Sequence, residues 1–231
     1  MDERYIRQVI LPEVGEGGQA RLRSARAVVV GAGGLGSAVL YYLAAAGVGR
    51  IDIIDSDIVE MSNLNRQFVH TEADIGRSKA VSAMEKITRL NSGICVTASD
   101  ARVTAQNAGE FVRGCDVAVS CADNRPTRLI LGGECAENGI PLIDGGVSGF
   151  EGYVLAVLPG ADTRLDRILP AAEDGGGSQQ GVIGAAAGIV GSMMALQAIK
   201  VLLSASIGRP LYYIDLAGLR ILPMEGEKDA K

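Results

Sequence analysis

A glycine-rich turn is the first feature of this sequence that could do chemistry. It runs Gly31-Ala-Gly33-Gly34-Leu-Gly36, follows a compact apolar run and opens a helical stretch. Glycines at these positions permit a tight turn and close approach of a phosphate, and a helix N-terminus supplies free N–H groups. Asp55 comes roughly 20 residues further on, where an acid at a strand end can bind ribose hydroxyls. These residues predict a nucleotide site, which fits NAD as well as ATP.

Charged and amide side chains further along favour a triphosphate. The run SNLNRQF (62–68) contains Arg66, and Lys79 follows slightly later. A dehydrogenase has no general need for these cations, whereas the charge of a triphosphate must be neutralised as its α-phosphate is attacked. Asp123, in CADN (121–124) at a predicted strand end, can hold Mg²⁺ against phosphate oxygens. Taken singly, Arg66 could be a surface charge and Asp123 a helix N-cap.

The elements that must position these residues alternate along the chain. Short apolar runs predict strands over 27–30, 50–54, 94–98, 117–120, 141–144, 152–157 and 211–215. Helical spacing predicts helices over 35–46, 79–91 and near 128–138, and residues 4–26 predict a short helix, a Gly-rich turn and a second helix. The expected fold class is α/β: a doubly wound, mostly parallel Rossmann-like sheet with helices on both faces. Antiparallel strands are added toward the C-terminus, and residues 1–231 are expected to form a single domain.

Composition excludes several classes of function. A net charge of −5, 4% aromatic residues and no Trp offer neither a basic face nor stacking platforms for nucleic acid. Charged residues after Met1 do not resemble a signal peptide, so we expect a cytoplasmic protein with reduced cysteines. The uncharged stretch 181–196 is short for a bilayer and predicts a buried helix, not a membrane span. A single histidine, His70, nearly excludes triads and metal sites that need His.

The sequence resembles the E1-like activating enzymes, the family that includes the molybdopterin-synthase and thiamine-pathway adenylyltransferases (MoeB/ThiF/HesA). The resemblance runs from Arg4 to about Leu222. It rests on RYIRQVILPEVGEGGQARL (4–22), GAGGLG (31–36), DSDIVEMSNLNRQF (55–68), GRSKA (76–80), CADN (121–124) and GIVGSMMALQAIKVLL (188–203).

This resemblance implies roles for individual residues. Asp55 would hold the ribose, and Gly34 would contact phosphates through its backbone. The expected catalytic residues are Arg7, donated across a homodimer interface, Arg66 and Lys79 on the phosphates, and Asp123 on Mg²⁺. The nucleotide-binding set would comprise Gly31, Gly33, Gly34, Gly36, Asp55, Asp57, Ser62, Asn63, Asn65, Arg66, Lys79, Asp123 and Asn124.

The implied reaction is ATP-dependent adenylation. The C-terminal glycine carboxylate of a small ubiquitin-like or sulfur-carrier protein ending in Gly-Gly would attack the α-phosphate and release pyrophosphate. The carboxylate is already ionised at pH 7, so no general base is needed. The carrier's tail would thread toward Asp123, and residues 162–180 correspond to the loop that covers this tail in the family.

The sequence departs from the family in its cysteines. Many relatives hold a structural Zn²⁺ with two CxxC pairs, but neither RLDRILP (164–170) nor the C-terminal end contains Cys. We therefore predict no zinc. Residues 158–180 also lack Cys, so we expect no covalent enzyme–carrier intermediate, and thiolation would use a separate sulfur donor. We expect Cys95, Cys115, Cys121 and Cys135 to be small buried hydrophobes.

Three alternatives remain open. A NAD(P)-dependent oxidoreductase would explain the glycine turn and Asp55 but not Arg66, Lys79 or Asp123. A non-catalytic scaffold could keep the fold and bind a carrier without activating it. A dehydratase relative could adenylate a tRNA-linked carboxylate, although the acidic charge makes tRNA binding unfavourable.

Overall fold

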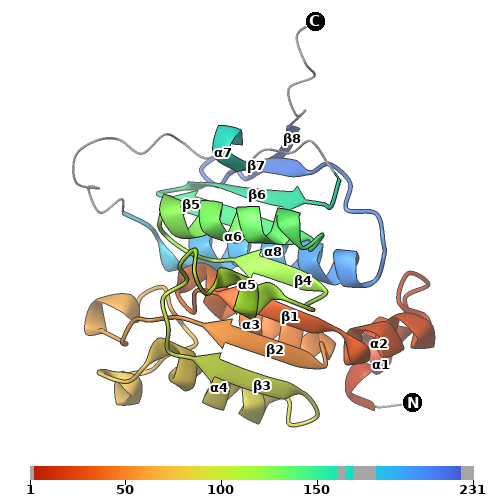
Figure 1. The fold of residues 1–231 in the computed structure, drawn as a ribbon, viewed down its shortest axis with the longest axis horizontal. Helices are drawn as coiled ribbons and strands as arrows, with labels where there is room; N and C mark the ends of the chain where they lie inside the picture. Colours follow the sequence, from red (N-terminus) through yellow and green to blue (C-terminus); the bar gives the residue numbers. More distant parts are fainter. Residues whose placement is uncertain (1–2, 161–164, 169–180, 225–231) are drawn as a thin grey trace, which may run out of the picture.

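An eight-stranded sheet organises the chain (Figure 1). The computed structural model describes residues 3–160, 165–168 and 181–224. The strands are β1 (Arg26–Val30), β2 (Arg50–Ile54), β3 (Cys95–Ser99), β4 (Val117–Ser120), β5 (Leu142–Ser148), β6 (Glu151–Val157), β7 (Leu211–Asp215) and β8 (Arg220–Met224). Their order is β3-β2-β1-β4-β5-β6-β7-β8. The pairings from β3 to β5 are parallel and those from β5 to β8 are antiparallel, which confirms the predicted fold class.

Helices cover both faces of the sheet. They are α1 (Ile6–Val9), α2 (Gly15–Ser24), α3 (Gly34–Ala46), α4 (Lys79–Leu90), α5 (Ala108–Val112), α6 (Arg125–Glu137), α7 (Leu165–Ile168) and α8 (Gly184–Leu202). In Figure 1, α5 and α6 lie on the near face, and α3, α4 and α8 lie on the far face. Because β1 to β5 are parallel, their carboxyl ends meet at one edge of the sheet. An open α/β sheet binds its ligands at this edge.

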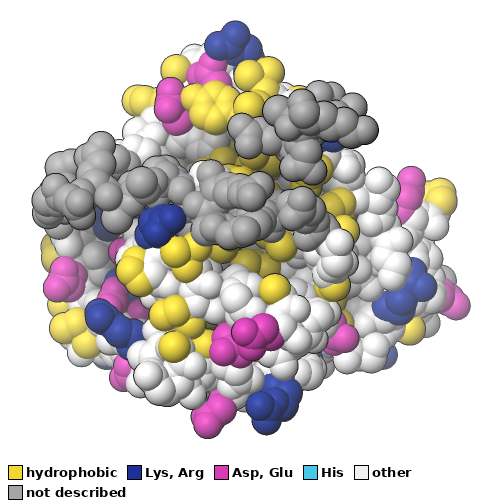
Figure 2. Space-filling view, turned by 45° about the horizontal axis from the view of Figure 1, so that its top comes forward, with side chains coloured by type: hydrophobic (Ala, Val, Ile, Leu, Met, Phe, Trp, Pro, Cys, Tyr) yellow, Lys and Arg dark blue, Asp and Glu magenta, His cyan; other side chains and the backbone are white. Residues whose placement is uncertain are grey.

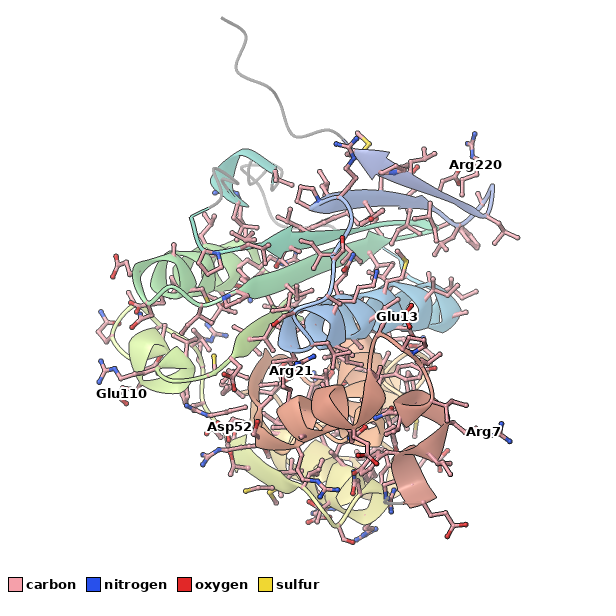
Figure 3. All side chains as sticks on the ribbon, turned by 90° about the vertical axis from the view of Figure 1, so that its right-hand side faces the viewer. Arg7, Glu13, Arg21, Asp52, Glu110 and Arg220 are labelled. Atoms are coloured by element: carbon pink, nitrogen blue, oxygen red, sulfur yellow. The ribbon has the colours of Figure 1, made fainter. Side chains whose placement is uncertain are left out.

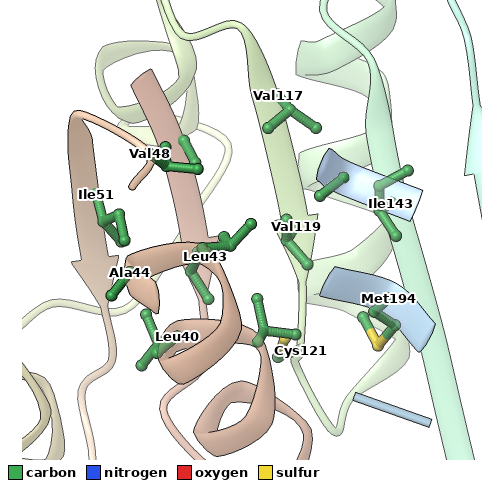
Figure 4. Packing of buried hydrophobic residues seen from close by; sticks show 14 of the residues in the cluster. Leu40, Leu43, Ala44, Val48, Ile51, Val117, Val119, Cys121, Ile143 and Met194 are labelled. Carbon is green, nitrogen blue, oxygen red and sulfur yellow. The ribbon is translucent and has the colours of Figure 1, made fainter. Parts of the chain in front are cut away.

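Alternation along β1 explains why two cores form. Val29 points into the cluster that contains Leu40 and Leu43 of α3 and Met194 of α8 (Figure 4). Val28 joins the opposite cluster, which contains Leu131 of α6. Successive strand residues face opposite sides, so a continuous apolar run is buried on both faces.

Helix α8 is long and apolar enough to cross a membrane by length and composition alone. Half of its apolar window is buried inside the protein, where it packs on α3 and on strands β4, β5 and β6. Gly191 makes the approach to α3 possible, because a Cβ there would lie 2.5 Å from the Leu35 carbonyl oxygen. The prediction of a close-packed core helix is confirmed.

Three sequence expectations were wrong in detail. The short helix and the second helix predicted within residues 4–26 are present, but the glycines lie at the start of α2 and not in the turn before it; there Gly18 lets α2 pack against Leu203, 2.9 Å from where a Cβ would stand. The helix predicted near 128–138 begins at Arg125. Strand β5 continues past Asp144 through two glycines, where a Cβ on Gly145 would meet the Met194 sulfur at 2.5 Å.

The C-terminal hairpin β7–β8 lies at the edge of the sheet. Strand β8 was not predicted, because every one of its residues is exposed and its sequence lacks a buried face. Hydrophobic side chains gather at the top of Figure 2, over this hairpin. They include Leu219, Ile221 and Met224, which are all exposed. The expectation of a covering loop over 162–180 falls largely outside the described residues.

Candidate nucleotide-binding site

The glycine-rich loop joins β1 to α3 at the carboxyl edge of the sheet. Its first residue, Gly31, has φ +100°, in the region that favours glycine. A Cβ on Gly31 would also lie 2.7 Å from the carbonyl oxygen of Cys121. Helix α3 starts at Gly34 with no side-chain cap at Gly33. The first N–H groups of α3 are therefore available to an anion.

The glycines of this loop serve different purposes. A Cβ on Gly36 would lie 2.0 Å from the Gly31 carbonyl oxygen, so the turn itself requires glycine there. At Gly33 the nearest heavy atom, Gln67 Nε2, would be 3.6 Å from a Cβ, an ordinary contact distance. Protein packing does not demand glycine at 33, whereas close approach of a ligand would.

Asp55 ties this loop to the end of β2. Its Oδ2 accepts a hydrogen bond from the Ala32 N–H at 2.7 Å, and its Oδ1 accepts one from the Asp57 N–H at 2.8 Å. Burial raises the pKa of Asp55, while these two N–H groups and the charge of Lys79 act in the opposite direction. The acid predicted to hold a ribose therefore also shapes the turn beside it.

Lys79 is the first residue of α4 and is almost fully buried. Its Nζ lies 2.9 Å from Oδ2 of Asp57. The two partners differ in exposure: the side chain of Lys79 is 8% exposed and that of Asp57 is 59% exposed. The ammonium is therefore held near the loop by a carboxylate that water can reach.

The SNLNRQF segment folds into a tight turn. Asn63 is buried, and its Oδ1 accepts from the Glu60 N–H, which caps the 3-10 helix Met61–Asn63. Ser62 Oγ donates to a carboxylate oxygen of Glu60 at 3.3 Å. Arg66 donates through Nη1 to the Ser62 carbonyl at 2.9 Å and to Asn65 Oδ1 at 3.1 Å. The guanidinium thus hydrogen-bonds to residues of the turn that contains it. Both contacts are exposed, so phosphate oxygens can replace them.

Asp123 and Asn124 follow β4, and both are exposed. Asn124 caps α6, because its Oδ1 accepts from the Thr127 N–H at 3.0 Å. The alternative that Asp123 caps this helix is wrong. The carboxylate of Asp123 receives only a long 3.4 Å contact from the Asn124 amide among the described side chains. It is therefore available to a cation.

A buried charged cluster lies behind this turn and was not found from the sequence. Arg128 donates through Nε to the Ala122 carbonyl at 2.7 Å and contacts the Tyr153 hydroxyl. That hydroxyl donates to Oδ2 of Asp144 at 2.7 Å. Asp144 is fully buried, and burial raises its pKa against the charge of Arg128. The three residues come from α6, β6 and β5, so no local spacing connects them.

A family model described as "ThiF family" matches residues 5–228. The chain belongs to the ThiF family. Among its relatives, "SAMP-activating enzyme E1" of Haloferax volcanii is 44% identical over 219 residues, covering 91% of this chain and 80% of the relative. "Sulfur carrier protein adenylyltransferase" of Thermus thermophilus is 43% identical over 218 residues, covering 90% of this chain and 80% of the relative. The family resemblance read from the sequence is confirmed.

Solved structures show the same fold. A crystal structure of E. coli MccB with MccA-N7isoASN superposes with a TM-score of 0.87 at 21% identity, covering 100% of this chain and 74% of that chain. At this identity the likeness supports the fold alone.

Arg7 does not reach the site of its own ThiF-family chain. It lies on α1, which sits beside α2 at the edge where the parallel strands begin, opposite the glycine-rich loop (Figure 1). Figure 3 shows its side chain pointing away from the rest of the molecule. Arg7 can therefore serve a nucleotide site only in another chain.

The cysteines are mostly as expected. Cys115, Cys121 and Cys135 are buried, and burial raises the pKa of Cys115 to about 11 and that of Cys135 to about 12. Cys95 is exposed, contrary to expectation, because β3 is the edge strand of the sheet. Within the described residues, no group of three His, Cys, Asp or Glu side chains could hold a metal ion.

Proposed function

We propose that this chain uses ATP to adenylate the C-terminal glycine carboxylate of a small ubiquitin-like or sulfur-carrier protein. The observation that carries this proposal is the arrangement of two cations and one free carboxylate around a glycine-rich loop. Arg66, Lys79 and Asp123 follow β2 and β4, whose carboxyl ends lie beside the loop after β1. The relatives named as an E1 and as an adenylyltransferase support the same activity.

In this proposal each residue acts by position or charge. The N–H groups at the start of α3 receive phosphate oxygens, and Asp55 accepts from the ribose. Arg66 and Lys79 neutralise the charge that develops as the α-phosphate is attacked. Their present partners, Ser62, Asn65 and Asp57, are exposed and are exchanged for phosphate oxygens when ATP binds.

The chemistry balances without a general base. An ionised carboxylate oxygen of the carrier forms a bond to the α-phosphorus, and the bond from that phosphorus to the bridging oxygen of pyrophosphate breaks. The products are an acyl-adenylate and pyrophosphate. A chain with one histidine, buried away from solvent, can perform this reaction.

The donor set fits Mg²⁺ delivered with ATP. Asp123 offers one accessible carboxylate, and the described residues supply no cluster of further ligands. Mg²⁺ is commonly bound by one or two carboxylates together with substrate phosphates and water. Mg²⁺ held there would neutralise phosphate charge, and Asp123 would fix its place beside the loop.

A groove beside the SNLNRQF turn suits an extended Gly-Gly tail. Gly184 packs directly against this turn, because a Cβ there would lie 2.3 Å from the Asn65 carbonyl oxygen. The groove has a volume of about 450 Å³ and is lined by Asn65, Gly149, Phe150, Gly181, Val182, Ile183 and Gly184. Its lining is mainly apolar, and its three glycines leave the backbone open to close approach by an extended tail.

We also propose a cytoplasmic homodimer in which Arg7 of one chain enters the nucleotide site of the other. The exposed position of α1, at the edge opposite its own loop, supports this arrangement. Thiolation of the activated carrier would require a separate sulfur donor, because residues 158–180 contain no Cys and the thiols of Cys115, Cys121 and Cys135 are buried.

ATP–pyrophosphate exchange tests the proposal. Purified protein is incubated with Mg²⁺, labelled pyrophosphate and a panel of small carriers that end in Gly-Gly. Exchange is expected with at least one carrier and is expected to require its free terminal carboxylate. Asp123→Ala should abolish exchange without loss of stability, because the residue is exposed. The matched control is Glu137→Ala, at the far end of α6.

Other outcomes would favour the alternatives. ATP binding with no exchange for any carrier would favour the scaffold, and protection against thermal unfolding by NADH but not by Mg-ATP would favour the oxidoreductase. Exchange that survives Asp123→Ala would remove the magnesium assignment while leaving the reaction intact.

A further inference from the structure

The one histidine of the chain is buried against the glycine-rich loop. His70 is 4% exposed. Its Nε2 lies 2.9 Å from the carbonyl oxygen of Ala32, and its Nδ1 lies 2.9 Å from Oγ of Ser82. A carbonyl oxygen can only accept, so Nε2 carries the hydrogen. In the neutral ring Nδ1 then accepts, and the Ser82 hydroxyl donates to it.

This hydrogen bond is the end of a longer buried chain. Lys86 donates to Oγ of Ser82 at 2.9 Å and to Oδ2 of Asp74 at 2.5 Å. Asp74 and Ser82 are themselves buried. Each donor has a defined acceptor. The hydrogen bonds therefore run, from donor to acceptor, from Lys86 to Ser82, from Ser82 to His70 and from His70 to the Ala32 carbonyl. A satisfied buried network of this kind holds its members in one arrangement.

The contact with Ala32 controls a group in the nucleotide loop. The Ala32 carbonyl and the Gly33 N–H belong to the same peptide unit, which is planar and trans, so they point in opposite directions. Fixing the carbonyl toward His70 therefore fixes the Gly33 N–H on the other side. Asp55 holds the N–H of Ala32 at 2.7 Å, so the residue is anchored at both ends. Among the described residues no acceptor takes the Gly33 N–H.

The same segment also carries the catalytic arginine. Four residues before His70 stands Arg66, and the chain between them follows the loop closely. The Val69 N–H points to Oγ of Ser37 at 3.4 Å, and that hydroxyl donates to the Gly33 carbonyl at 2.7 Å. Gln67 is 5% exposed and lies against Gly33. The loop and the arginine turn are thus joined at several buried points, and His70 is one of them.

We propose that His70 is a positioning residue for adenylation, which orients the Gly33 N–H toward the nucleotide and keeps Arg66 in register with the loop. This inference rests on the proposed function only where it is tested by pyrophosphate exchange; the Mg-ATP affinity tests it independently.

Charged groups around the imidazole add a dependence on pH. Burial and the charges of Lys86 and Lys79 lower the pKa of His70, against the Ala32 carbonyl and Asp74, which act in the opposite direction. The ring is therefore neutral at pH 7. Protonation puts a second N–H on the side of Ser82 and adds a charge beside two lysines, which loosens the contact with the loop.

Two variants separate positioning from packing. His70→Leu fills the space but donates nothing, whereas His70→Gln can still donate to the Ala32 carbonyl. Val112→Ala, in the core on the opposite face of the sheet, is a control for general destabilisation. For each variant we would measure the Kd of Mg-ATP by calorimetry, the kcat and carrier KM of pyrophosphate exchange, and Tm.

His70→Leu is expected to weaken Mg-ATP binding and lower kcat by roughly tenfold each, the effect of about one lost hydrogen bond. The carrier KM should not change, and His70→Gln should recover most of the loss. The affinity of the unaltered protein for Mg-ATP should decline as the pH falls through the folded-state pKa of His70, which lies below its ordinary value, and His70→Gln should lack this decline.

The proposal is overturned if His70→Leu and Val112→Ala behave alike at equal Tm. If His70→Leu does not fold, an acid decline that persists in His70→Gln overturns it instead. If no carrier supports exchange, the proposed function fails, but the Mg-ATP affinities still decide the role of His70. A protein that binds no ATP at all would overturn both.

Discussion

The ammonium of Lys79 lies 2.9 Å from a carboxylate oxygen of Asp57, and only the carboxylate is well exposed to water. The lysine is therefore placed beside the glycine-rich loop before any nucleotide arrives. Because Asp57 is 59% exposed, its carboxylate stays hydrated when a phosphate replaces it as the partner of the buried ammonium. This relationship leads to the first prediction.

Lys79→Met should lower pyrophosphate exchange by roughly 100-fold or more, because a preorganised charge aimed at the developing transition state is lost. Tm should change little, since Met keeps most of the packing of the lysine stem. Lys200→Met is the matched control, because Lys200 lies in the last turn of α8 and has no role in the proposed site. Equal activity of the two variants would remove Lys79 from the catalytic set.

Gly33→Ala and Gly36→Ala should fail in different ways. At Gly33 a Cβ has ordinary contacts, so the variant should fold with nearly unchanged Tm but bind Mg-ATP at least several-fold more weakly. At Gly36 the Cβ would stand 2.0 Å from a backbone oxygen, and the strain should cost roughly 1–3 kcal/mol or more of unfolding free energy. Thermal melts with and without Mg-ATP distinguish the two, and a Gly33→Ala protein with normal affinity would contradict the role given to the loop.

Arg7→Ala mixed with Arg66→Ala should regain activity if Arg7 acts in the partner's site. In a heterodimer one of the two sites has both arginines, so a random mixture should recover about one quarter of the sites. Arg7→Ala mixed with the double variant supplies no complete site and is the control. Verified heterodimers without recovery would show that Arg7 does not act in trans.

Metal analysis by mass spectrometry should find zinc well below one ion per chain. The four cysteines stand at 95, 115, 121 and 135, away from both regions where relatives place CxxC pairs. A thiolate-rich tetrahedral site therefore lacks its ligands. One tightly held zinc per chain, resistant to chelators, would show that other residues have replaced those pairs.

Stability should fall in two steps as the pH is lowered. Burial and nearby lysines depress the pKa of His70, so its contribution is complete above about 6.5 and is lost as the pH falls toward the folded-state pKa. Burial would raise the pKa of Asp74, but hydrogen bonds from Lys86 and Thr71 hold it well below its usual value. Its contribution is present above about pH 4 and is lost below that.

Chemical unfolding at pH 8, 6, 5 and 3.5 measures both steps. His70→Gln should remove the first decline, between pH 8 and 5, and keep the second. A variant that declines over the whole range like the unaltered protein would show that another group titrates in the first window.

Much of the fold could be predicted because its signals are local. The apolar runs at 27–30 and 117–120 are buried on both faces, which is typical of parallel strands covered by helices. Strand β8 gave no such signal, because it lies at the sheet edge with no buried residue. The start of α6 was predicted too late, because its first turn, which contains Pro126 and is capped by Asn124, lacks an apolar helical spacing.

In the candidate site, too, some residues could be predicted from the sequence and others could not. Arg66, Lys79 and Asp123 were predicted because each lies within a recognisable motif. The contacts of His70 with Ala32, and of Arg128 with Tyr153 and Asp144, were not found. Residue types and spacing give no sign of them, because the partners come from separate loops, strands or helices that only the folded chain brings together.

The sequence by itself determined the strand and helix periods, the glycine loop and the identity of the charged residues that follow the strands. These depend on short-range sterics and on which side chains can neutralise phosphate. Only the tertiary structure decided which residues meet: Ala32 and His70 are 38 positions apart, and their contact exists because the crossover after β2 returns the chain to the loop after β1. Hydrogen bonds act over about 3 Å, so partners across such a crossover are set by the packed fold and not by spacing along the chain.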